Sequence, residues 1–430
     1  MNKRAHLFFC IVIIQVFFYS TAVAEEARIM AGIAQTDITP PIGGRTWGYA
    51  AAKPTDGLYD RLMARVLILQ SSDTTAALVS WDVCEFQSPW LRDHMPEMGI
   101  DTLLLFNSHT HAGPDLSQSD FPSADKPWKR TIEERILEAI KEAQKNLFPA
   151  YIAAEKGSIP LGYNRLRRDP DGLATTIFNN LDRIPYGPVD PTVGILRVTD
   201  ETGKIRVVLV NYACHAVVLG SENRKISADY PGAMARAVEQ RLNEVMCMFV
   251  QGGGDINPLF MGRSGDPKED YEPVLKMGNR LADNVMDTLD RMKDIPGKSQ
   301  QFVTATEVLT VNHRWEREKT LRFGVTSILI NHEIGIVTLP GEPFIKFQFD
   351  VRERAALPFA FLFGYCDNSY QDWPNWYLPD IEAAAREGYG ASDAGIAEVG
   401  TGERLMNQGL IQLYTLRGML HAEPKPGRRG

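Results

Sequence analysis

Two histidines separated by a single residue offer the clearest chemistry in this chain. His109 and His111 come shortly after an apolar run at residues 102–106. Alternate residues of an extended segment face the same side, so both imidazoles can point into one pocket. Two imidazoles that face one point are typical ligands of zinc. The spacing therefore predicts a metal site at the end of a buried strand.

Two further residues at comparable positions could complete such a site. His215 follows the apolar run 207–210, and Glu342 follows the run 335–337. Two or three histidines and one carboxylate form the usual ligand set of an open, catalytic zinc site. Each residue also has a structural interpretation, since His215 could be a hydrogen-bonded core histidine and Glu342 could cap the helix that follows it.

A glycine-rich turn at residues 252–254 precedes Asp255. The turn resembles a phosphate-binding loop but lacks the Lys-Ser/Thr pair that would follow one. We interpret it as a close approach of the backbone, whose amides could donate hydrogen bonds to an oxyanion.

The elements that must position these residues can be read from the apolar runs. Near-continuous apolar runs bounded by Gly, Pro and Asn are typical of buried strands, and such sheets collect ligands where their strands end. The expected fold class is α/β, with mixed sheets flanked by helices in a single large catalytic domain and the metal site at the C-terminal ends of strands. Asp229 is expected to cap the second helix. The expected strands include residues 102–106, 207–210, 246–250, 335–337 and 359–363, the helices 128–147, 231–244, 274–292 and 403–416, and a long loop 160–191.

The two ends of the chain differ from its middle. A basic start, an apolar stretch and small residues at 22–24 predict a secretory signal peptide over residues 1–24. Residues 25–421 are long enough for a large core in one elaborate domain or in two closely packed ones, and we expect one catalytic domain. Residues 422–430 are mainly Pro, Gly and Arg and are expected to be disordered. The expected location is therefore outside the cell or in the periplasm.

The net charge bears on possible binding partners, and the cysteine content bears on possible disulfides. The net charge of −8 comes without a basic block, so no nucleic-acid partner is expected. Buried thiols and disulfides are both compatible with the cysteines beyond residue 24, and no pairing is predicted. These cysteines are Cys84, Cys214, Cys247 and Cys366.

Six motifs in a fixed order resemble those of the neutral/alkaline non-lysosomal ceramidase family. The resemblance extends from Gly32 to about Leu416 and implies that family's catalytic domain alone, without its immunoglobulin-like C-terminal domain. The motifs are Trp47-Gly48-Tyr49-Ala50, Asn107-Ser108-His109-Thr110-His111-Ala112-Gly113-Pro114, Asn164-Arg165, Cys214-His215, Gly254-Asp255-Ile256-Asn257-Pro258 and Pro340-Gly341-Glu342.

The resemblance implies one zinc ion held by His109, His215, Glu342 and a tyrosine. In the family the ligand tyrosine comes twelve residues before a second active-site tyrosine, a spacing that Tyr377 and Tyr389 reproduce here. Tyr370 is the alternative ligand, because it follows Asn368-Ser369 as the family's tyrosine does.

The resemblance also assigns roles around the metal. His111 is expected to carry a proton to the leaving amine, and Arg165 and Tyr389 are expected to stabilise the oxyanion. The expected substrate contacts are Gly48, Asn164, Asp255, Asn257 and Trp376.

Two departures from the family bear on the substrate. Asn257 stands where the family's Gly-Asp-x-Ser-Pro motif has its serine, and residues 373–376 form a Trp-rich insertion.

The resemblance implies a secreted zinc-dependent amidohydrolase that cleaves an N-acyl bond through metal-activated water. The alternatives are a deacylase or esterase that acts on a polar N-acyl or O-acyl sugar, or a secreted binding protein that keeps only the pocket. The expected partner is a small-molecule or lipid N-acyl substrate, with transient contact with a membrane surface; the oligomeric state is not predicted.

Overall fold

The computed structural model describes residues 28–50, 53–72, 74–293, 300–366 and 377–420. Its centre is a sheet of twelve strands in the order β13-β11-β10-β6-β1-β3-β4-β5-β19-β17-β16-β15. Neighbours are antiparallel except for the parallel pairs β11–β13, β4–β5 and β17–β19. This mixed sheet with flanking helices confirms the α/β class. The strands are β1 (Ile29–Asp37), β3 (Met63–Gln70), β4 (Thr75–Trp81), β5 (Thr102–Asn107), β6 (Phe148–Ser158), β10 (Thr192–Asp200), β11 (Ile205–Tyr212), β13 (Met246–Gln251), β15 (Phe302–Asn312), β16 (Thr320–Ile330), β17 (Ile334–Pro340) and β19 (Phe359–Cys366).

The sheet folds back on itself, so that strands far apart in its order pack face to face. Strand β13, at one edge of the sheet, packs across the central strands β19, β5 and β4, although several strands separate them in the sheet order. Ser80 Oγ of β4 donates a hydrogen bond to Phe249 O of β13 at 2.6 Å, and Asn211 Nδ2 of β11 donates to Leu362 O of β19 at 3.1 Å. One apolar cluster, with members from all twelve strands, fills the space between the two halves. The fold-back brings the ends of distant strands together.

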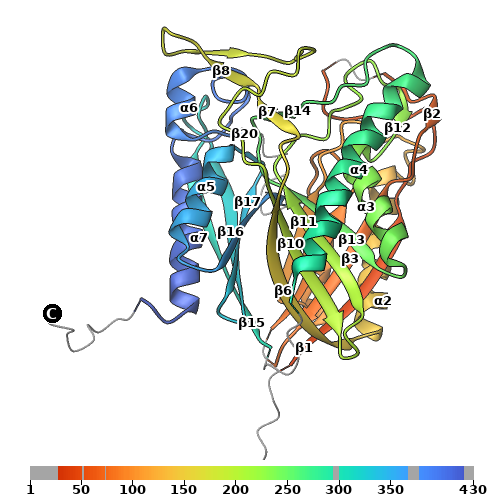
Figure 1. Cartoon of the computed structure of the whole chain (residues 1–430), viewed down its shortest axis with the longest axis vertical. Coiled ribbons are helices and arrows are strands. Elements are labelled where there is room, and N and C mark those ends of the chain that lie inside the picture. The colour runs from red at the N-terminus through yellow and green to blue at the C-terminus, as the bar shows by residue number, and fades with distance from the viewer. Residues whose placement is uncertain (1–27, 51–52, 73, 294–299, 367–376, 421–430) are drawn as a thin grey trace, which may run out of the picture.

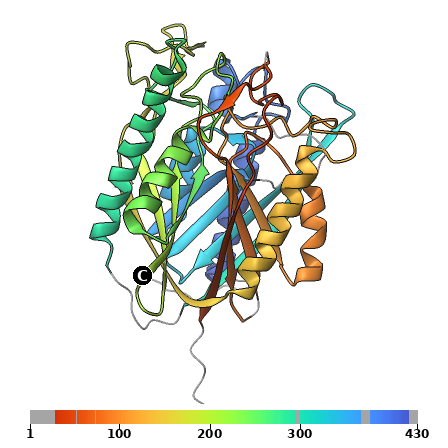
Figure 2. The ribbon, with the colours of Figure 1, turned by 90° about the vertical axis from the view of Figure 1, so that its right-hand side faces the viewer.

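Helices cover the outer face of the sheet. Helices α3 and α4 pack on the side of β10 and β11, α1 and α2 on that of β3 and β4, and α5 and α7 on that of β16 and β17. Figures 1 and 2 show these groups around the sheet. Each group shields one apolar stripe from water, which is the main stabilising effect of such packing. The helices are α1 (Pro89–His94), α2 (Trp128–Lys145), α3 (Asp229–Leu242), α4 (Pro267–Arg291), α5 (Ile345–Arg354), α6 (Ile381–Arg386) and α7 (Thr401–Leu416), with a 3-10 turn at Pro96–Met98.

Short strands gather at one end of the molecule, at the top of Figure 1. They form two-stranded pairs that hold the loops beyond the large sheet: β2 with β12, β7 with β14, β8 with β9 and β18 with β20. Their bounds are β2 (Gly57–Leu58), β7 (Gly162–Asn164), β8 (Leu166–Arg168), β9 (Ala174–Thr176), β12 (Lys225–Ile226), β14 (Ile256–Pro258), β18 (Glu342–Pro343) and β20 (Tyr377–Leu378).

Three local expectations were wrong. Residues 160–191 are not one long loop, because they contain β7, β8 and β9. Helix α4 begins at Pro267 rather than at residue 274, and Asp266 caps it by accepting a hydrogen bond from the amide of Lys268. Asp229 is not the N-cap of α3; Ala228 is, and Asp229 is the first helical residue, where its carboxylate accepts a hydrogen bond from the amide of Tyr230 at 2.7 Å.

The expected signal peptide, Tyr370, Trp376 and the tail lie outside the described residues. Among the described helices none combines the length and apolar character needed to cross a membrane. The four cysteines beyond residue 24 are buried, and Cys84, Cys214 and Cys247 are free thiols.

Candidate metal centre and active site

Three strands of the large sheet lead into the candidate metal centre. His109 follows β5, His215 follows β11 and Glu342 follows β17. The backbone of His109 is held in the left-handed region, with φ of 62°, and its amide donates to Val83 O at 3.0 Å. The amide of His215 donates to Ile256 O at 2.9 Å. Backbone contacts beyond the strands therefore fix the direction of both imidazoles.

The three side chains converge on one point. His215 Nε2 lies 2.9 Å from Glu342 Oε2, and His109 Nε2 lies 3.4 Å from the same oxygen. The three ligand atoms lie within 4.8 Å of one another, and all three residues are buried. With bonds of about 2.0–2.1 Å, two ligand atoms of a tetrahedral zinc ion lie roughly 3.3 Å apart. The distances of 2.9 Å and 3.4 Å from the two histidines to Glu342 Oε2 therefore suit a shared cation.

The hydrogen bonds of the two imidazoles fix their tautomers. His109 Nδ1 lies 2.8 Å from Cys84 O, and His215 Nδ1 lies 3.1 Å from Ile256 O. A backbone carbonyl can only accept, so each Nδ1 must carry the proton and donate. In the neutral ring each Nε2 then presents its lone pair to the carboxylate of Glu342. Lone pairs that face one another at 2.9 Å repel unless a proton or a metal ion lies between them, and two imidazoles and one carboxylate fit a divalent metal ion.

The electrostatics of the site favour the protonation states that metal ligands need. Burial lowers the pKa of His215 to about 4, against the opposing effect of Glu342, so the imidazole is neutral near pH 7. Burial alone would raise the pKa of Glu342, but His109 and His215 hold it well below its ordinary value. A neutral imidazole and an ionised carboxylate are both ready to bind a metal without losing a proton first.

An arginine and two tyrosines lie beside this centre. Strand β20 pairs with β18 so that Tyr377 is the register partner of Glu342. The Tyr377 ring lies 6.3 Å from that of His215, centroid to centroid. The Arg165 guanidinium lies 4.8 Å from the centre of the Tyr377 ring and 5.1 Å from that of Tyr389. Burial raises the pKa of Tyr377 well above its ordinary value, and Arg165 opposes the shift.

His111 lies at the same centre, at the boundary of two cavities. Its Nε2 is 3.1 Å from His109 Nε2. Its ring packs edge-to-face with the ring of Tyr49, with 4.7 Å between the ring centroids. Burial, together with the neighbouring histidines, holds the pKa of His111 well below its ordinary value. Gly48 is held with φ of +110°, and a Cβ there would come within 2.4 Å of His111 Nδ1. A glycine is therefore required for His111 to occupy its position.

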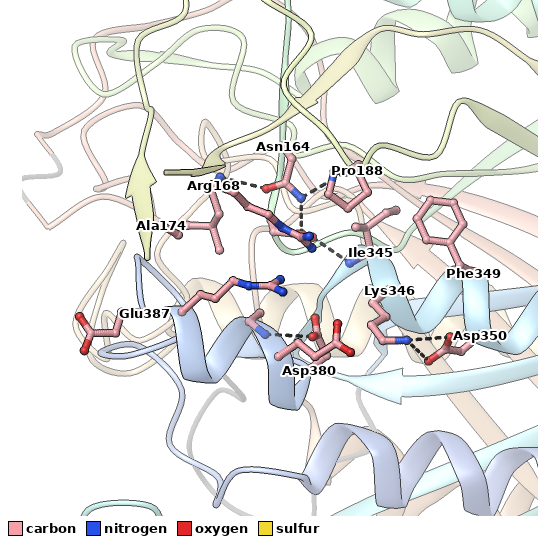
Figure 3. Close-up of a pocket in the computed structure, with 15 residues that line it drawn as sticks. Asn164, Arg168, Ala174, Pro188, Ile345, Lys346, Phe349, Asp350, Asp380 and Glu387 are labelled. Carbon is pink, nitrogen blue, oxygen red and sulfur yellow. Dashed lines mark hydrogen bonds and ion pairs between the residues drawn. The ribbon is translucent and has the colours of Figure 1, made fainter. Parts of the chain in front are cut away.

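Asn164 and Asp255 form a hydrogen-bonded pair next to the metal centre. Asn164 Nδ2 donates to Asp255 Oδ2 at 2.6 Å, and the amide of Ile345 donates to Asp255 Oδ1 at 2.8 Å. Asp255, rather than Glu342, therefore caps the start of α5. Both side chains line a separate cavity of about 280 Å³, and Figure 3 shows Asn164 in its wall near Pro188 and Ile345. Asn257 Oδ1 accepts a hydrogen bond from Arg165 at 3.4 Å and lines a cavity at the metal centre.

The glycine-rich turn makes a close backbone approach. A Cβ on Gly254 would lie 2.5 Å from Glu342 O. The amide of Gly254 donates to Pro343 O at 2.7 Å, so this amide is already used and is not free for an oxyanion. The turn fixes the backbone of Glu342.

Two residues of the site carry no signal in the sequence. Tyr365 Oη lies 3.4 Å from Glu342 Oε2, and its ring centroid lies 4.5 Å from that of His109. Cys84 supplies the carbonyl that orients His109. Tyr365 ends an ordinary apolar strand and Cys84 acts through its backbone, so side-chain type and spacing could not have revealed either residue.

Fold and site together define a mixed α/β protein with a buried His-His-Glu centre where its strands end. The chain belongs to the neutral/alkaline non-lysosomal ceramidase family, whose N-terminal part matches residues 29–266. Among curated proteins, it is 23% identical over 338 residues to neutral ceramidase of Drosophila melanogaster, covering 66% of this chain and 46% of that protein. It is 27% identical over 242 residues to neutral ceramidase B of Dictyostelium discoideum, covering 49% and 33%. The chain thus spans less than half of either relative.

Solved structures share the fold. The neutral ceramidase of Pseudomonas aeruginosa matches with a TM-score of 0.71 at 14% identity, over 93% of this chain and 76% of that one. A ceramidase complexed with C2 matches with a TM-score of 0.70 at the same identity and coverage. At this level of identity the match establishes the architecture and leaves the chemistry to be argued from the site.

Proposed function

We propose that this protein is a zinc-dependent amidohydrolase of the ceramidase type, which cleaves the amide bond of an N-acyl substrate. His109, His215 and Glu342 would hold the metal, and Tyr377 would be the fourth ligand. The observation that carries the proposal is the convergence of His109 Nε2, His215 Nε2 and a Glu342 carboxylate oxygen within 4.8 Å of one another, a set of ligand atoms that a shared cation would hold together. Family membership and the pairing of Tyr377 with Glu342 in register support it.

A bound zinc ion would supply two effects, polarisation of the substrate carbonyl and a lower pKa for water. The protein's own groups supply the rest. Arg165 lies beside Tyr389 and hydrogen-bonds the Tyr377 hydroxyl, and its Nε has no partner among the described residues, so Arg165 can donate to the oxyanion of the tetrahedral intermediate.

Proton transfer is assigned to His111. Because burial keeps its pKa low, His111 is neutral before the reaction and can accept a proton from the attacking water. It then donates that proton to the amide nitrogen, so that a neutral amine leaves. His111 Nδ1 has no hydrogen-bond partner among the described residues, whereas Nε2 lies 3.1 Å from His109 Nε2, so Nδ1 is the ring nitrogen without a competing hydrogen bond.

The proposal is tested by measuring metal content and turnover together. Elemental analysis of the purified protein should find about one zinc per chain. Chelation should abolish hydrolysis of a short-chain N-acyl amine, and added zinc should restore it. His109→Ala should lose both metal and turnover while its circular dichroism stays native. Full turnover by the metal-free protein would refute the proposal. Bound zinc without turnover of any acyl amide or ester would favour a binding protein.

Other parts of the proposal concern the chain's setting. We infer secretion or periplasmic location from the predicted signal peptide at residues 1–24, and a catalytic domain over residues 25–421. Transient contact with a membrane surface is proposed for lipid substrates. N-terminal sequencing of the mature protein from the expressed full chain tests the first point, since cleavage after residue 24 is expected.

A further inference from the structure

Two adjoining cavities meet at His111 beside the metal centre. One, of about 370 Å³, is lined by Glu85, Asp115 and Glu342 among others; we call it the acidic cavity. The other, of about 390 Å³, is lined by Arg165 and Arg263 among others; we call it the arginine cavity. His111, Tyr377 and Tyr389 line both. An amide held at the metal would therefore extend one half into each cavity.

The arginine cavity has a one-sided charge. None of the described residues that line it is Asp or Glu, whereas it has two arginines, and its remaining polar side chains are neutral amides, hydroxyls and imidazoles. The acidic cavity differs, because Arg45, the one arginine among its described lining residues, already pairs with Asp115 at 3.1 Å. A cavity lined by cationic groups and by no carboxylate attracts an anion, and low-dielectric walls strengthen that attraction.

Arg165 is a buried cation with an unused donor. It is 2% exposed, its guanidinium hydrogen-bonds the Tyr377 hydroxyl, and its Nε has no hydrogen-bond acceptor among the described residues. One Nη donates to Asn257 Oδ1 at 3.4 Å, a long hydrogen bond. A buried donor without an acceptor is unfavourable, so the site can receive an acceptor from a ligand. The oxyanion would use part of this capacity, and a second acceptor group can use the rest.

Arg263 provides the second cation at the mouth of the same cavity. Its guanidinium donates to Asn179 Oδ1, and no carboxylate of the described chain forms an ion pair with it. Gly220 lets it lie close to the backbone, since a Cβ there would come within 2.8 Å of Arg263 Nε. An arginine held at a cavity mouth by neutral groups is suited to bidentate binding of a carboxylate.

We propose that the substrate carries a carboxylate next to its scissile amide, and that this group binds in the arginine cavity between Arg263 and Arg165. This inference rests on the proposed amide hydrolysis and narrows its substrate class from N-acyl amines in general to acidic ones. The carboxylate can belong to the amine half, as in an N-acyl amino acid, or to the acyl half, as in an N-succinyl amine.

The test compares matched acidic and uncharged substrates. N-octanoylglycine is measured against N-octanoylglycinamide, and N-succinyl octylamine against the corresponding succinamide, which distinguishes the two sources of the carboxylate. The kcat/KM of the acid should exceed that of its amide by about 10-fold in one of the two pairs, as expected for a charge-assisted hydrogen bond. Arg263→Gln should bring this ratio close to one, and Arg263→Lys should keep part of it. Lys268→Gln, an equal charge change at an exposed residue outside the cavity, should leave the ratio unchanged.

Failure of this inference can be separated from failure of the proposed function. Zinc-dependent hydrolysis with a ratio near one in both pairs, or a ratio unaffected by Arg263→Gln, overturns the carboxylate site and leaves the hydrolase intact. If no substrate is cleaved, calorimetry measures binding of the same four compounds to the zinc-loaded protein. Acids that bind about 10-fold more tightly than their amides, with the difference lost in Arg263→Gln, support the site without catalysis. Equal binding of acids and amides overturns it.

Discussion

Replacing Gly48 by alanine should separate the position of His111 from the metal ligands. The new Cβ would lie 2.4 Å from His111 Nδ1 and 2.5 Å from its Cγ. Ordinary contacts between such atoms need about 3.5 Å, so the imidazole must move by roughly 1 Å. A displacement of that size in a catalytic group costs about 10²-fold in rate. We therefore expect Gly48→Ala to lower kcat by about two orders of magnitude.

The same substitution also strains the backbone, and the chain offers a matched control. Gly43 has φ of +108°, close to the +110° of Gly48, but a Cβ there meets no atom within 4 Å. Either alanine should cost about 1–3 kcal/mol of stability through its left-handed conformation. Gly43→Ala should therefore lower the melting temperature as Gly48→Ala does and keep full turnover.

The assay combines kcat/KM on an N-acyl amine, zinc content by elemental analysis and thermal melting of both variants. Zinc content should stay near the wild-type value in Gly48→Ala, because the nearest atoms met by the new Cβ all belong to His111. Unchanged turnover in Gly48→Ala would refute the steric reasoning. Equal loss of turnover in Gly43→Ala would show that backbone strain, and not His111, is responsible. Loss of zinc together with turnover would make His111 a metal ligand.

Three further predictions concern charge at the centre. Glu342→Gln should weaken zinc binding by at least about 10²-fold, measured by competition with a chromogenic chelator, and wild-type affinity would contradict the assigned ligand set. Arg165→Gln should lower kcat by about 10²–10³-fold with zinc content unchanged, since it removes a donor to the oxyanion; a loss confined to KM would exclude that role. His215 has a folded pKa of about 4, below the ordinary value, so its neutral form contributes stability that is lost as pH falls. In the metal-free protein, the wild type's advantage in unfolding free energy over His215→Gln should therefore shrink by up to about 3 kcal/mol between roughly pH 6.5 and pH 4, measured by urea titration; a pH-independent difference would contradict this.

The sequence was most informative where one local pattern determined the structure. The amphipathic stripe at residues 128–147 predicted α2, observed at Trp128–Lys145, because a helix with one apolar face has a single favourable orientation on a sheet. The start of helix α4 was predicted seven residues too late, because its first two turns are polar and periodicity begins only at Val274. The cap at Asp266 followed by Pro267 was the available signal. The short strands β7 to β9 were missed because pairs of three residues leave no periodicity to detect.

The candidate site was predictable in its residue types and not in its geometry. Strand ends suggested that His109, His215 and Glu342 could meet, and the structure brings them together. Nothing local could show that the sheet folds back, since that depends on contacts such as Asn211 with Leu362, 151 residues apart. The carbonyl partners that fix the two tautomers depend on the same long-range packing. The hydrogen bond from the amide of Ile345 to Asp255, 90 residues apart, could not be predicted either, and the substrate contact expected of Asp255 stays a prediction.

The fold-back of the large sheet divides the proposed ligand set along the chain. A fragment that ends at Arg291, the last residue of α4, would retain His109 and His215, while Glu342 and Tyr377 would belong to the remaining piece. Neither piece alone would have the complete set of donors, so tight zinc uptake would report their reassociation. The cation would then cross-link two parts of the polypeptide. Removal of zinc should first weaken the contacts between these two parts.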